Sequence, residues 1–341
     1  MTTMNKGIQG LKGKGSQRTM LEGALVLIVI ALALVIRTKL PGGELRAVST
    51  IFMFIALSQA WNIIGGFTGY ASFGQVVFFG MGGYFTAVVM LKFHFSFWLA
   101  LPLAGVFAAV FAALIGQPLL KLKGHYFAIA TLGVAEGMRE VVINLPDLTG
   151  GGAGISVPIA GTFAKTQYLG DAGFYLLFLG LALFAVGIGT LVSRNKFGYG
   201  LRAIHQNEDA AAAVGINTVR SKVMAYSLSA FITGVVGASY VFQQVTIFPE
   251  RLFDVEITVL MIMMVVIGGS GTVVGPLLGA IGLQFISEYL REHFTNVHTF
   301  ILAAIIILAV ILIPQGAVNY FREGRRTKDY SLLANIRRYR L

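Results

Sequence analysis

The chain has 341 residues, of which 56% are hydrophobic and 12% charged, with a net charge of +11 and no cysteine. Soluble globular proteins average roughly 45–50% apolar and about 25% charged residues, so this composition excludes a soluble globular domain. It also excludes a disordered chain and a disulfide scaffold. The length accommodates a bundle of membrane helices, since each crossing needs about 20 apolar residues.

Nine apolar stretches follow one another along the chain, and most are long enough to span a bilayer as helices. They lie near 20–36, 47–66, 68–91, 96–120, 125–144, 174–193, 223–246, 256–286 and 298–314. The first follows a basic stretch and contains Ala31-Leu32-Ala33, so a cleaved signal peptide is the alternative to an uncleaved first helix. The many spans behind it favour the helix.

The stretch 256–286 predicts a broken helix. As one helix of about 31 residues it would be about 46 Å long, well beyond a bilayer core of about 30 Å. The run Gly268-Gly269-Ser270-Gly271 interrupts it. We therefore expect either two passes or a re-entrant hairpin, both of which return the chain to the side it left. We therefore expect an all-α polytopic protein with about ten passes and both termini on one face of the membrane. A single pass here would put the termini on opposite faces.

Lysine and arginine favour alternate loops. With ten passes, 18 of the 26 lie in the segments 1–19, 121–124, 194–222 and 315–341. The positive-inside rule then places both termini in the cytoplasm, although Arg37, Lys39 and Arg46 crowd one outer loop. We expect basic cytoplasmic tails at 1–20 and 316–341 around a transmembrane domain at 21–315. Orientation explains the positive charge better than a nucleic-acid surface, for which no soluble domain is present.

Catalytic motifs are missing from the sequence. There is no G-x-x-x-x-G-K-[ST] run to hold nucleotide phosphates, and no G-x-G-x-x-G, H-E-x-x-H or G-x-S-x-G run. The five histidines lack metal-ligand spacing. We expect no catalytic residue, no metal site and no cofactor in this chain.

The inside loop 194–222 predicts a short helix at its centre. Asn207 is placed to cap it, Glu208 and Asp209 suit the positive end of the helix dipole, four alanines follow, and Gly215 ends it. Such a helix has no large apolar side chains and cannot form a core. It can lie in a groove on another protein, and a solvated loop helix is the equal alternative.

Three ionisable residues, Glu136, Arg139 and Glu140, share one helical face of the fifth span. Ionisable groups inside a bilayer are costly and usually pair or line a pathway. Two interpretations stay open, a structural ion pair between Glu136 and Arg139 and the polar lining of a substrate route. Other polar residues that would line this route are Asn62, Gln75, Tyr84, Tyr126 and Thr131.

Glycine gives a further pattern. Small-xxx-small spacing, which favours close packing of membrane helices, occurs at three places. These are Gly65/Gly69, Gly133/Gly137 and Gly271/Gly275/Gly279. The runs 65–69 and 268–271 are dense enough in glycine to break helices. Broken backbone at membrane depth is tolerated only against protein or a water-filled cavity.

Several spaced motifs resemble one family in the same order. They are Trp61–Gly66 running to Gly82-Gly83-Tyr84, Gly124–Gly133, Thr149–Gly152 with Gly154-Ile155, Leu201–Ile204 leading to Ala213–Asn217, and Ile267–Thr272 with Gly275-Pro276. Over about residues 45–315 the chain resembles the M-type permease of branched-chain amino acid ABC importers. The basic tails match nothing in that family.

The resemblance implies a non-catalytic subunit of the bacterial cytoplasmic (inner) membrane, surrounded by membrane lipid. Its partners would be a second, H-type permease, two ATPases that use ATP and Mg²⁺, and a periplasmic or lipid-anchored substrate-binding protein. The loop at 201–217 would be the coupling segment that docks in a cleft of the ATPase. The coupling residues expected are Asn207, Glu208, Asp209, Ala211, Ala212, Gly215 and Arg220.

Branched-chain amino acids are the implied solutes, delivered to the outer loops 145–173 and 247–256. Gln75 stands where some members carry histidine, and urea and short-chain amide permeases share most of these motifs, so those solutes are the alternative. An ion-gradient transporter with an ion site at Glu136 is a rival of another class. An intramembrane enzyme is disfavoured by the missing motifs.

Overall fold

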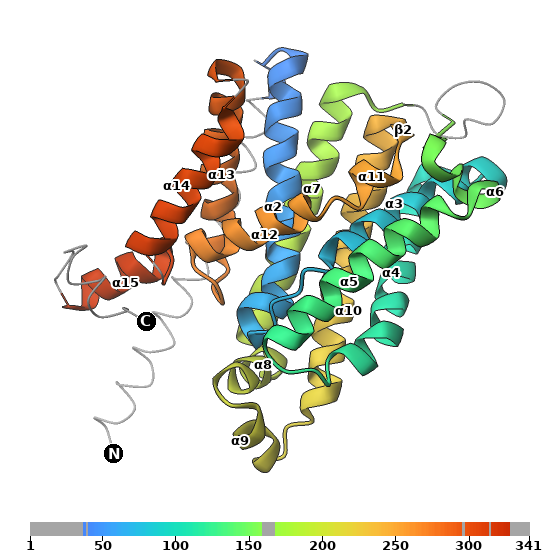
Figure 1. Ribbon diagram of the computed structural model, residues 1–341. Helices are drawn as coiled ribbons and strands as arrows, with labels where there is room; N and C mark the ends of the chain where they lie inside the picture. Colours follow the sequence, from blue (N-terminus) through green and yellow to red (C-terminus); the bar gives the residue numbers. More distant parts are fainter. Residues whose placement is uncertain (1–36, 39, 159–167, 295–296, 314, 328–341) are drawn as a thin grey trace, which may run out of the picture. The chain divides into compact units, whose positions relative to one another are not determined.

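The computed structural model describes residues 37–38, 40–158, 168–294, 297–313 and 315–327. The chain divides into two units, Met1–Arg46 and Ala47–Leu341, and the second contains nearly all the described residues. The predicted span 20–36, the tail 1–20 and the end of the C-terminal tail lie outside them. The described part of the second unit is helical, apart from one pair of two-residue strands (Figure 1).

Six helical runs among the described residues are long and apolar enough to cross a membrane, which confirms an all-α polytopic membrane protein. The first five match predicted stretches, and the sixth extends past the predicted span 298–314 into the predicted tail. They are α2 (Gly42–Thr68), α3 (Gln75–Lys92), α4 (Phe97–Leu119), α7 (Gly170–Arg194), α10 (Thr218–Gln244) and the run His298–Glu323, which holds α14 (His298–Leu312) and most of α15 (Ala317–Thr327).

Two predicted boundaries are wrong. The span expected from residue 68 begins only at Gln75, because Gly69 adopts a left-handed φ of 77° and residues 69–74 form a linker. The span expected from residue 223 begins at Thr218, because the Asn217 side chain accepts the N–H of Arg220 and caps the helix.

The fifth predicted span is a helix, α5 (His125–Ile143), that packs on α3 and α4. It is not among the six apolar runs, because Glu136, Arg139 and Glu140 lie within it.

The predicted break in 256–286 is confirmed. The chain forms α12 (Val255–Gly268) and α13 (Val274–His293) on either side of a linker with left-handed Gly269 and Gly271. With 14 residues, α12 reaches about 21 Å, short of a core of about 30 Å. In Figure 1, α13 runs back toward the end of the bundle opposite α9. Alone, α12 is therefore too short to cross the core, whereas α13, with 20 residues, is long enough.

The hairpin closes through glycines. A Cβ at Gly279 would lie 1.8 Å from the Met264 carbonyl oxygen, and one at Gly268 would lie 1.9 Å from that of Gly275. Close packing is thus confirmed for Gly275 and Gly279. A Cβ at Gly65 would meet only Trp61 of its own helix, and Gly133 and Gly137 have open space.

Helix α10 forms the centre of the bundle against α3 and α4. Backbones touch there: a Cβ at Gly82 would lie 2.3 Å from the Gly234 oxygen, and one at Gly237 would lie 2.1 Å from the Phe79 oxygen. Gly234 also packs on Ala108 of α4. Helices in such contact cannot slide independently.

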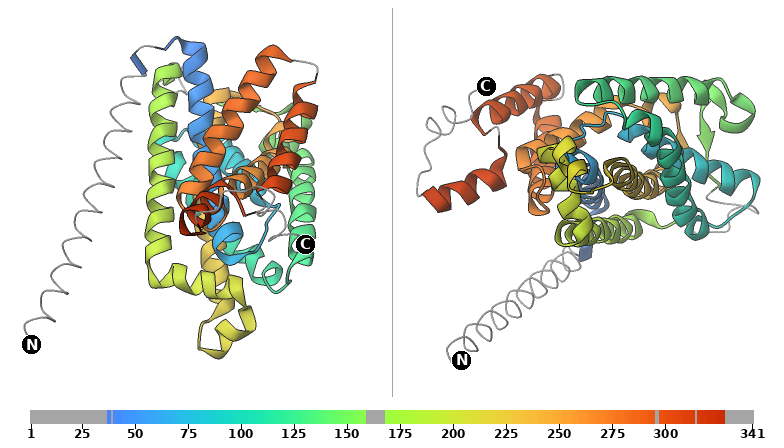
Figure 2. Two further views of the ribbon diagram at one scale, coloured as in Figure 1. Left: turned by 90° about the vertical axis from the view of Figure 1, so that its left-hand side faces the viewer. Right: turned by 90° about the horizontal axis from the view of Figure 1, so that it is seen from below.

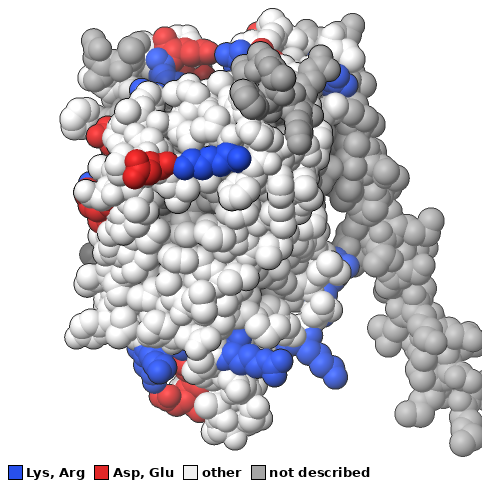
Figure 3. Space-filling model, turned by 90° about the vertical axis from the view of Figure 1, so that its right-hand side faces the viewer, with Lys and Arg blue, Asp and Glu red and all other residues white. Residues whose placement is uncertain are grey.

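Short elements gather at the two ends of the bundle. Beyond α7 and α10 lie α8 (Lys196–Gln206) and α9 (Glu208–Ala213), while α6, β2 and α11 lie toward the opposite end (Figures 1 and 2). The short elements of the opposite end are α6 (Pro146–Thr149), η1 (Gly151–Ala153), β1 (Ile155–Ser156), β2 (Thr246–Ile247) and α11 (Pro249–Leu252). The strands pair antiparallel, with Ile155 opposite Ile247. On the face in Figure 3, a largely uncharged band separates mostly basic side chains at the lower end, with an acidic group among them, from charges of both signs above.

Candidate functional site

The predicted helix in the loop 194–222 is α9, and its cap and stop are confirmed. Asn207 Oδ1 accepts the N–H of Ala210 at 3.0 Å. After Ala213 the chain turns through Gly215, whose φ is 90° and whose N–H donates to the Ala212 oxygen. Local sequence signals therefore fix both ends of this helix.

The far end of α9 projects away from the bundle (Figure 1). Ala212, Ala213, Val214 and Gly215 are exposed, Val214 to 79%, and a Cβ on Gly215 would meet nothing within 4 Å. Ala211 is buried and faces the bundle, so its side chain cannot form part of a docking surface. The exposed tip, residues 212–215, is small and apolar.

A second helix, α8, lies beside α9 and was not predicted. Leu201 and Ile204 bury its inner face, and Arg202 lies over the Phe67 ring at 5.2 Å. Its other side borders an open groove of about 520 Å³. The groove is lined by Lys196, Phe197, Tyr199, Gly200, Ile216 and Ser221. Ile216 of this groove directly follows the exposed tip in the chain.

The start of α9 is anchored by Glu208. Its Oε1 lies 2.6 Å from Lys222 Nζ in the first turns of α10, and its Oε2 accepts the hydroxyl of Tyr70 at 2.5 Å. Lys222 Nζ also donates to the Tyr70 hydroxyl at 2.9 Å and to the Leu120 carbonyl at 2.7 Å. We call these four residues the Lys222 cluster. Sequence reasoning counted Lys222 only as an inside charge and missed Tyr70 and Leu120.

The cluster keeps Glu208 ionised. Burial raises the pKa of this carboxyl, but hydrogen bonds from Lys222, Tyr70 and Thr218 outweigh it, and the pKa falls below its ordinary value of 4.5. Burial and the hydrogen bond to Glu208 raise the pKa of Tyr70, so its hydroxyl stays a donor. The Glu208 carboxyl is therefore ionised at neutral pH.

The other predicted coupling residues lie at the surface. Asp209 forms an exposed pair with Lys123, 3.0 Å away, with side-chain exposures of 85% and 64%. Arg220 is exposed, and its N–H is capped by Asn217. Exposed pairs of this kind contribute little to stability, because water and salt screen them.

Asn62, predicted to line a route, is hydrogen-bonded to the linker of the broken hairpin. It is fully buried on α2, where its Nδ2 donates to the Thr272 oxygen at 2.8 Å and its Oδ1 accepts the Gly271 N–H at 3.0 Å. Both ends of the amide are thus occupied by the linker between α12 and α13.

Gln75, Thr131 and Tyr84 are also buried. Gln75 donates to Ser229 and Thr233 of α10, while its Oε1 has no hydrogen-bond partner among the described residues. Thr131 accepts the N–H of Phe73. The Tyr84 hydroxyl is likewise without a described partner. Gln75 thus joins α3 to α10, and Thr131 joins α5 to the linker before α3.

Tyr126, Glu136 and Arg139 lie apart from them on the outer face of α5. Arg139 Nη2 is 3.0 Å from Glu136 Oε2 and 3.3 Å from Glu140 Oε1, so the structure contains the ion pair. The side chains of Glu136 and Glu140 are 48% and 57% exposed. The predicted route residues therefore divide into four buried side chains and three more exposed ones on α5, and the substrate route stays a prediction.

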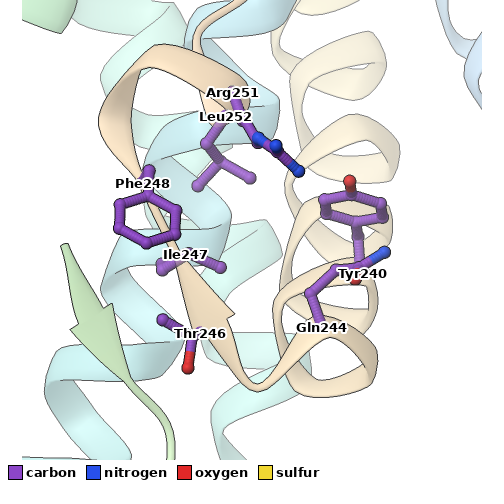
Figure 4. Close-up of a pocket in the computed structure, with 7 residues that line it drawn as sticks. All are labelled: Tyr240, Gln244, Thr246, Ile247, Phe248, Arg251 and Leu252. Atoms are coloured by element: carbon purple, nitrogen blue, oxygen red, sulfur yellow. The ribbon is translucent and has the colours of Figure 1, made fainter.

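The opposite end of the bundle carries a small cavity of about 60 Å³ (Figure 4). It is lined by Tyr240, Gln244, Thr246, Ile247, Phe248, Arg251 and Leu252. The Arg251 guanidinium and the Tyr240 hydroxyl face one another across it. A volume of this size holds a few water molecules or a carboxylate group, but not a whole leucine.

A polytopic helical bundle with a broken hairpin and a projecting, anchored helix at one end is the architecture of a membrane transport component. The chain belongs to the family described as "Branched-chain amino acid transport system / permease component", whose model matches residues 43–310.

Curated relatives agree with this family. The chain is 28% identical to the high-affinity branched-chain amino acid transport system permease protein LivM of Escherichia coli K12, over 95% of this chain and 83% of that one. It is 30% identical to the inner membrane ABC transporter permease protein YjfF of the same organism, over 75% and 78%. It is 25% identical to a probable LivH permease of Methanocaldococcus jannaschii, over 79% and 88%. No solved structure matches the chain.

Proposed function

We propose that this chain is a membrane-spanning subunit of an ABC importer for leucine, isoleucine and valine, without an ATPase site of its own. It works in the bacterial inner membrane with a second permease subunit, two ATPases that hydrolyse MgATP and a binding protein outside the membrane. Similarity to relatives named LivM and LivH supports a pair of related permeases.

The observation that carries the proposal is the anchored helix α9. Its tip is exposed, small and apolar, and its base is held by a buried ion pair. Such a helix suits a groove on an ATPase, where close backbone approach gives complementarity. Closure of the ATPases would move α9, and the permease pair would switch from outward-open to inward-open.

The proposed topology places α9 and both termini in the cytoplasm. A re-entrant α12–α13 hairpin leaves the chain on the side it entered, which supports an even number of crossings. We count eight crossings, including the span 20–36, plus the hairpin. The sequence estimate of ten passes counts the hairpin as two.

Single cysteines test this topology, since the natural chain has none. Ala213→Cys on the tip and Ser156→Cys on β1 are both exposed positions at opposite ends. An impermeant maleimide applied to inside-out vesicles should label only Ala213→Cys, and applied to spheroplasts only Ser156→Cys. The reverse pattern would refute the orientation.

Transport by the reconstituted importer tests the function. Liposomes that contain all subunits should accumulate labelled leucine only when ATP is inside and the binding protein is outside. Liposomes that contain this chain alone should not accumulate leucine. Preference for urea or acetamide over leucine would establish the alternative solute class. Uptake by the chain alone under a proton or sodium gradient would instead establish a secondary transporter.

A further inference from the structure

The Lys222 ammonium is the most enclosed charge among the described residues. Its side chain is 2% exposed. Lysine is almost never buried without partners, because removing its charge from water is costly. An ammonium group has three protons to donate. Here it has three oxygen acceptors, on Glu208, Tyr70 and Leu120, at 2.6–2.9 Å.

Each acceptor belongs to a different segment. Glu208 is the first residue of α9, Tyr70 lies in the linker between α2 and α3, and Leu120 is the residue at which α4 ends. Lys222 itself is on α10. One ammonium group therefore joins the projecting helix to three parts of the membrane bundle. The hydrogen bond from Tyr70 to Glu208 closes a triangle, so the carboxylate contacts both the ammonium and the linker.

The helices behind the cluster are in direct backbone contact. Gly234 and Gly237 of α10 bring its backbone against α4 and α3, as described above. A displacement of Lys222 along α10 would therefore act on α3 and α4 through close contacts. The covalent connection from α9 to α10, residues 214–217, is an exposed turn except at Ile216, which is half-buried and packs against the core.

We propose that Lys222 is the positioning residue through which motion of α9 reaches the membrane helices, by way of its contact with Glu208. The inference rests on the proposed function, in which α9 docks on an ATPase. It adds that coupling depends on the ion pair and not on the chain connection alone.

The test is the number of leucine molecules transported per ATP hydrolysed, in the complete importer reconstituted in liposomes. Lys222→Met removes the charge, and we expect the ratio to fall at least tenfold while the amount of assembled complex stays within twofold of wild type. Lys222→Arg keeps a cation that reaches the carboxylate and should restore a ratio within threefold. Lys123→Met, the matched control, removes the exposed pair with Asp209 and should leave the ratio unchanged.

A role in folding alone would lower the amount of complex and leave the ratio of the surviving complex normal, which would overturn the proposal. If Lys222→Met does not assemble, Glu208→Gln carries the test, because it keeps the shape of the side chain without its charge. A normal ratio in Glu208→Gln would then overturn it.

The same assay separates this inference from the proposed function. Gly215→Trp enlarges the exposed tip and should also lower the ratio. If Gly215→Trp uncouples transport and Lys222→Met does not, only the role of Lys222 is wrong. If neither does, α9 is not the docking helix.

Discussion

The side-chain amide of Asn62 donates to the carbonyl oxygen of Thr272, 210 positions later in the chain, at 2.8 Å. Its other end accepts the N–H of Gly271. One side chain thus satisfies two backbone groups that the break between α12 and α13 leaves without helical partners. The hairpin depends on α2 as well as on its own glycines.

Replacing Asn62 should therefore destabilise the protein. Asn62→Leu leaves the Gly271 N–H and the Thr272 carbonyl without this partner, at a cost of about 1–3 kcal/mol for each. We expect a clear fall in the thermal unfolding temperature of the purified permease. Asn144→Leu removes one exposed hydrogen bond of a side-chain amide and should shift the unfolding temperature little. Equal shifts would show that the Asn62 contacts do not hold the hairpin.

The contact of α10 with α3 predicts intolerance of one methyl group. Gly237→Ala would place a Cβ 2.1 Å from the Phe79 oxygen, so backbone has to move, at a cost of about 1–3 kcal/mol. Gly180→Ala on α7 has open space and should be neutral or slightly stabilising. Detergent unfolding of both variants checks this, and a stable Gly237→Ala protein would contradict the packing.

Glu208 gives a defined pH dependence. Its pKa is lowered in the folded protein, so the stability it contributes is fully present above its ordinary pKa of 4.5 and is lost as the pH falls through the lowered value. The unfolding temperature of wild type should exceed that of Glu208→Gln by a constant margin from pH 8 to pH 6, and the margin should narrow below pH 4.5. A margin that already changes between pH 8 and pH 6 would mean that the carboxyl is not held ionised.

Arg251 should matter for arrival of the solute. In the proposed orientation, the cavity lined by Arg251 faces the binding protein. The cavity fits a carboxylate group from that protein or from the amino acid. Arg251→Ala should raise the concentration of loaded binding protein needed for half-maximal transport about tenfold, equal to about 1.4 kcal/mol.

Arg291→Ala serves as the control, because it removes an exposed cation that pairs with Glu288 on α13. If Arg251→Ala needs the same concentration of loaded binding protein as wild type, the cavity has no part in delivery of the solute.

The outer face of α5 should be shielded from lipid. Ionised groups against acyl chains are costly, so we expect water or the second permease beside Glu136 and Arg139. In the assembled importer, Gly133→Cys should react with a water-soluble maleimide or cross-link to the partner permease. Gly180→Cys, also in open space, should react only with a membrane-soluble reagent. The opposite result would place the α5 charges toward lipid.

Sequence alone predicted the features that depend on neighbouring residues. The cap at Asn207, the stop at Gly215 and the break near Gly269 are local signals, and the structure contains all three. The helix α8 was missed because its glycines and charged residues give the segment the composition of a loop. Its two inward apolar residues, Leu201 and Ile204, were too few to indicate a helix.

The contacts that join distant segments were out of reach of such signals. Lys222 and Tyr70 are 152 positions apart, and nothing near either residue in the sequence indicates that they meet. Asn62 is a similar case. The sequence around a buried amide does not indicate whether its partner is a solute or a backbone turn 210 residues away.

The charged outer face of α5 also bears on how the protein is made. If the second permease is what shields this face, a newly inserted copy that has not met that partner would hold Glu136, Arg139 and Glu140 against the hydrocarbon, where ionised groups are costly. Such an orphan is a natural target for membrane proteolysis, so the cellular abundance of this subunit should follow the supply of the other permease rather than its own rate of synthesis.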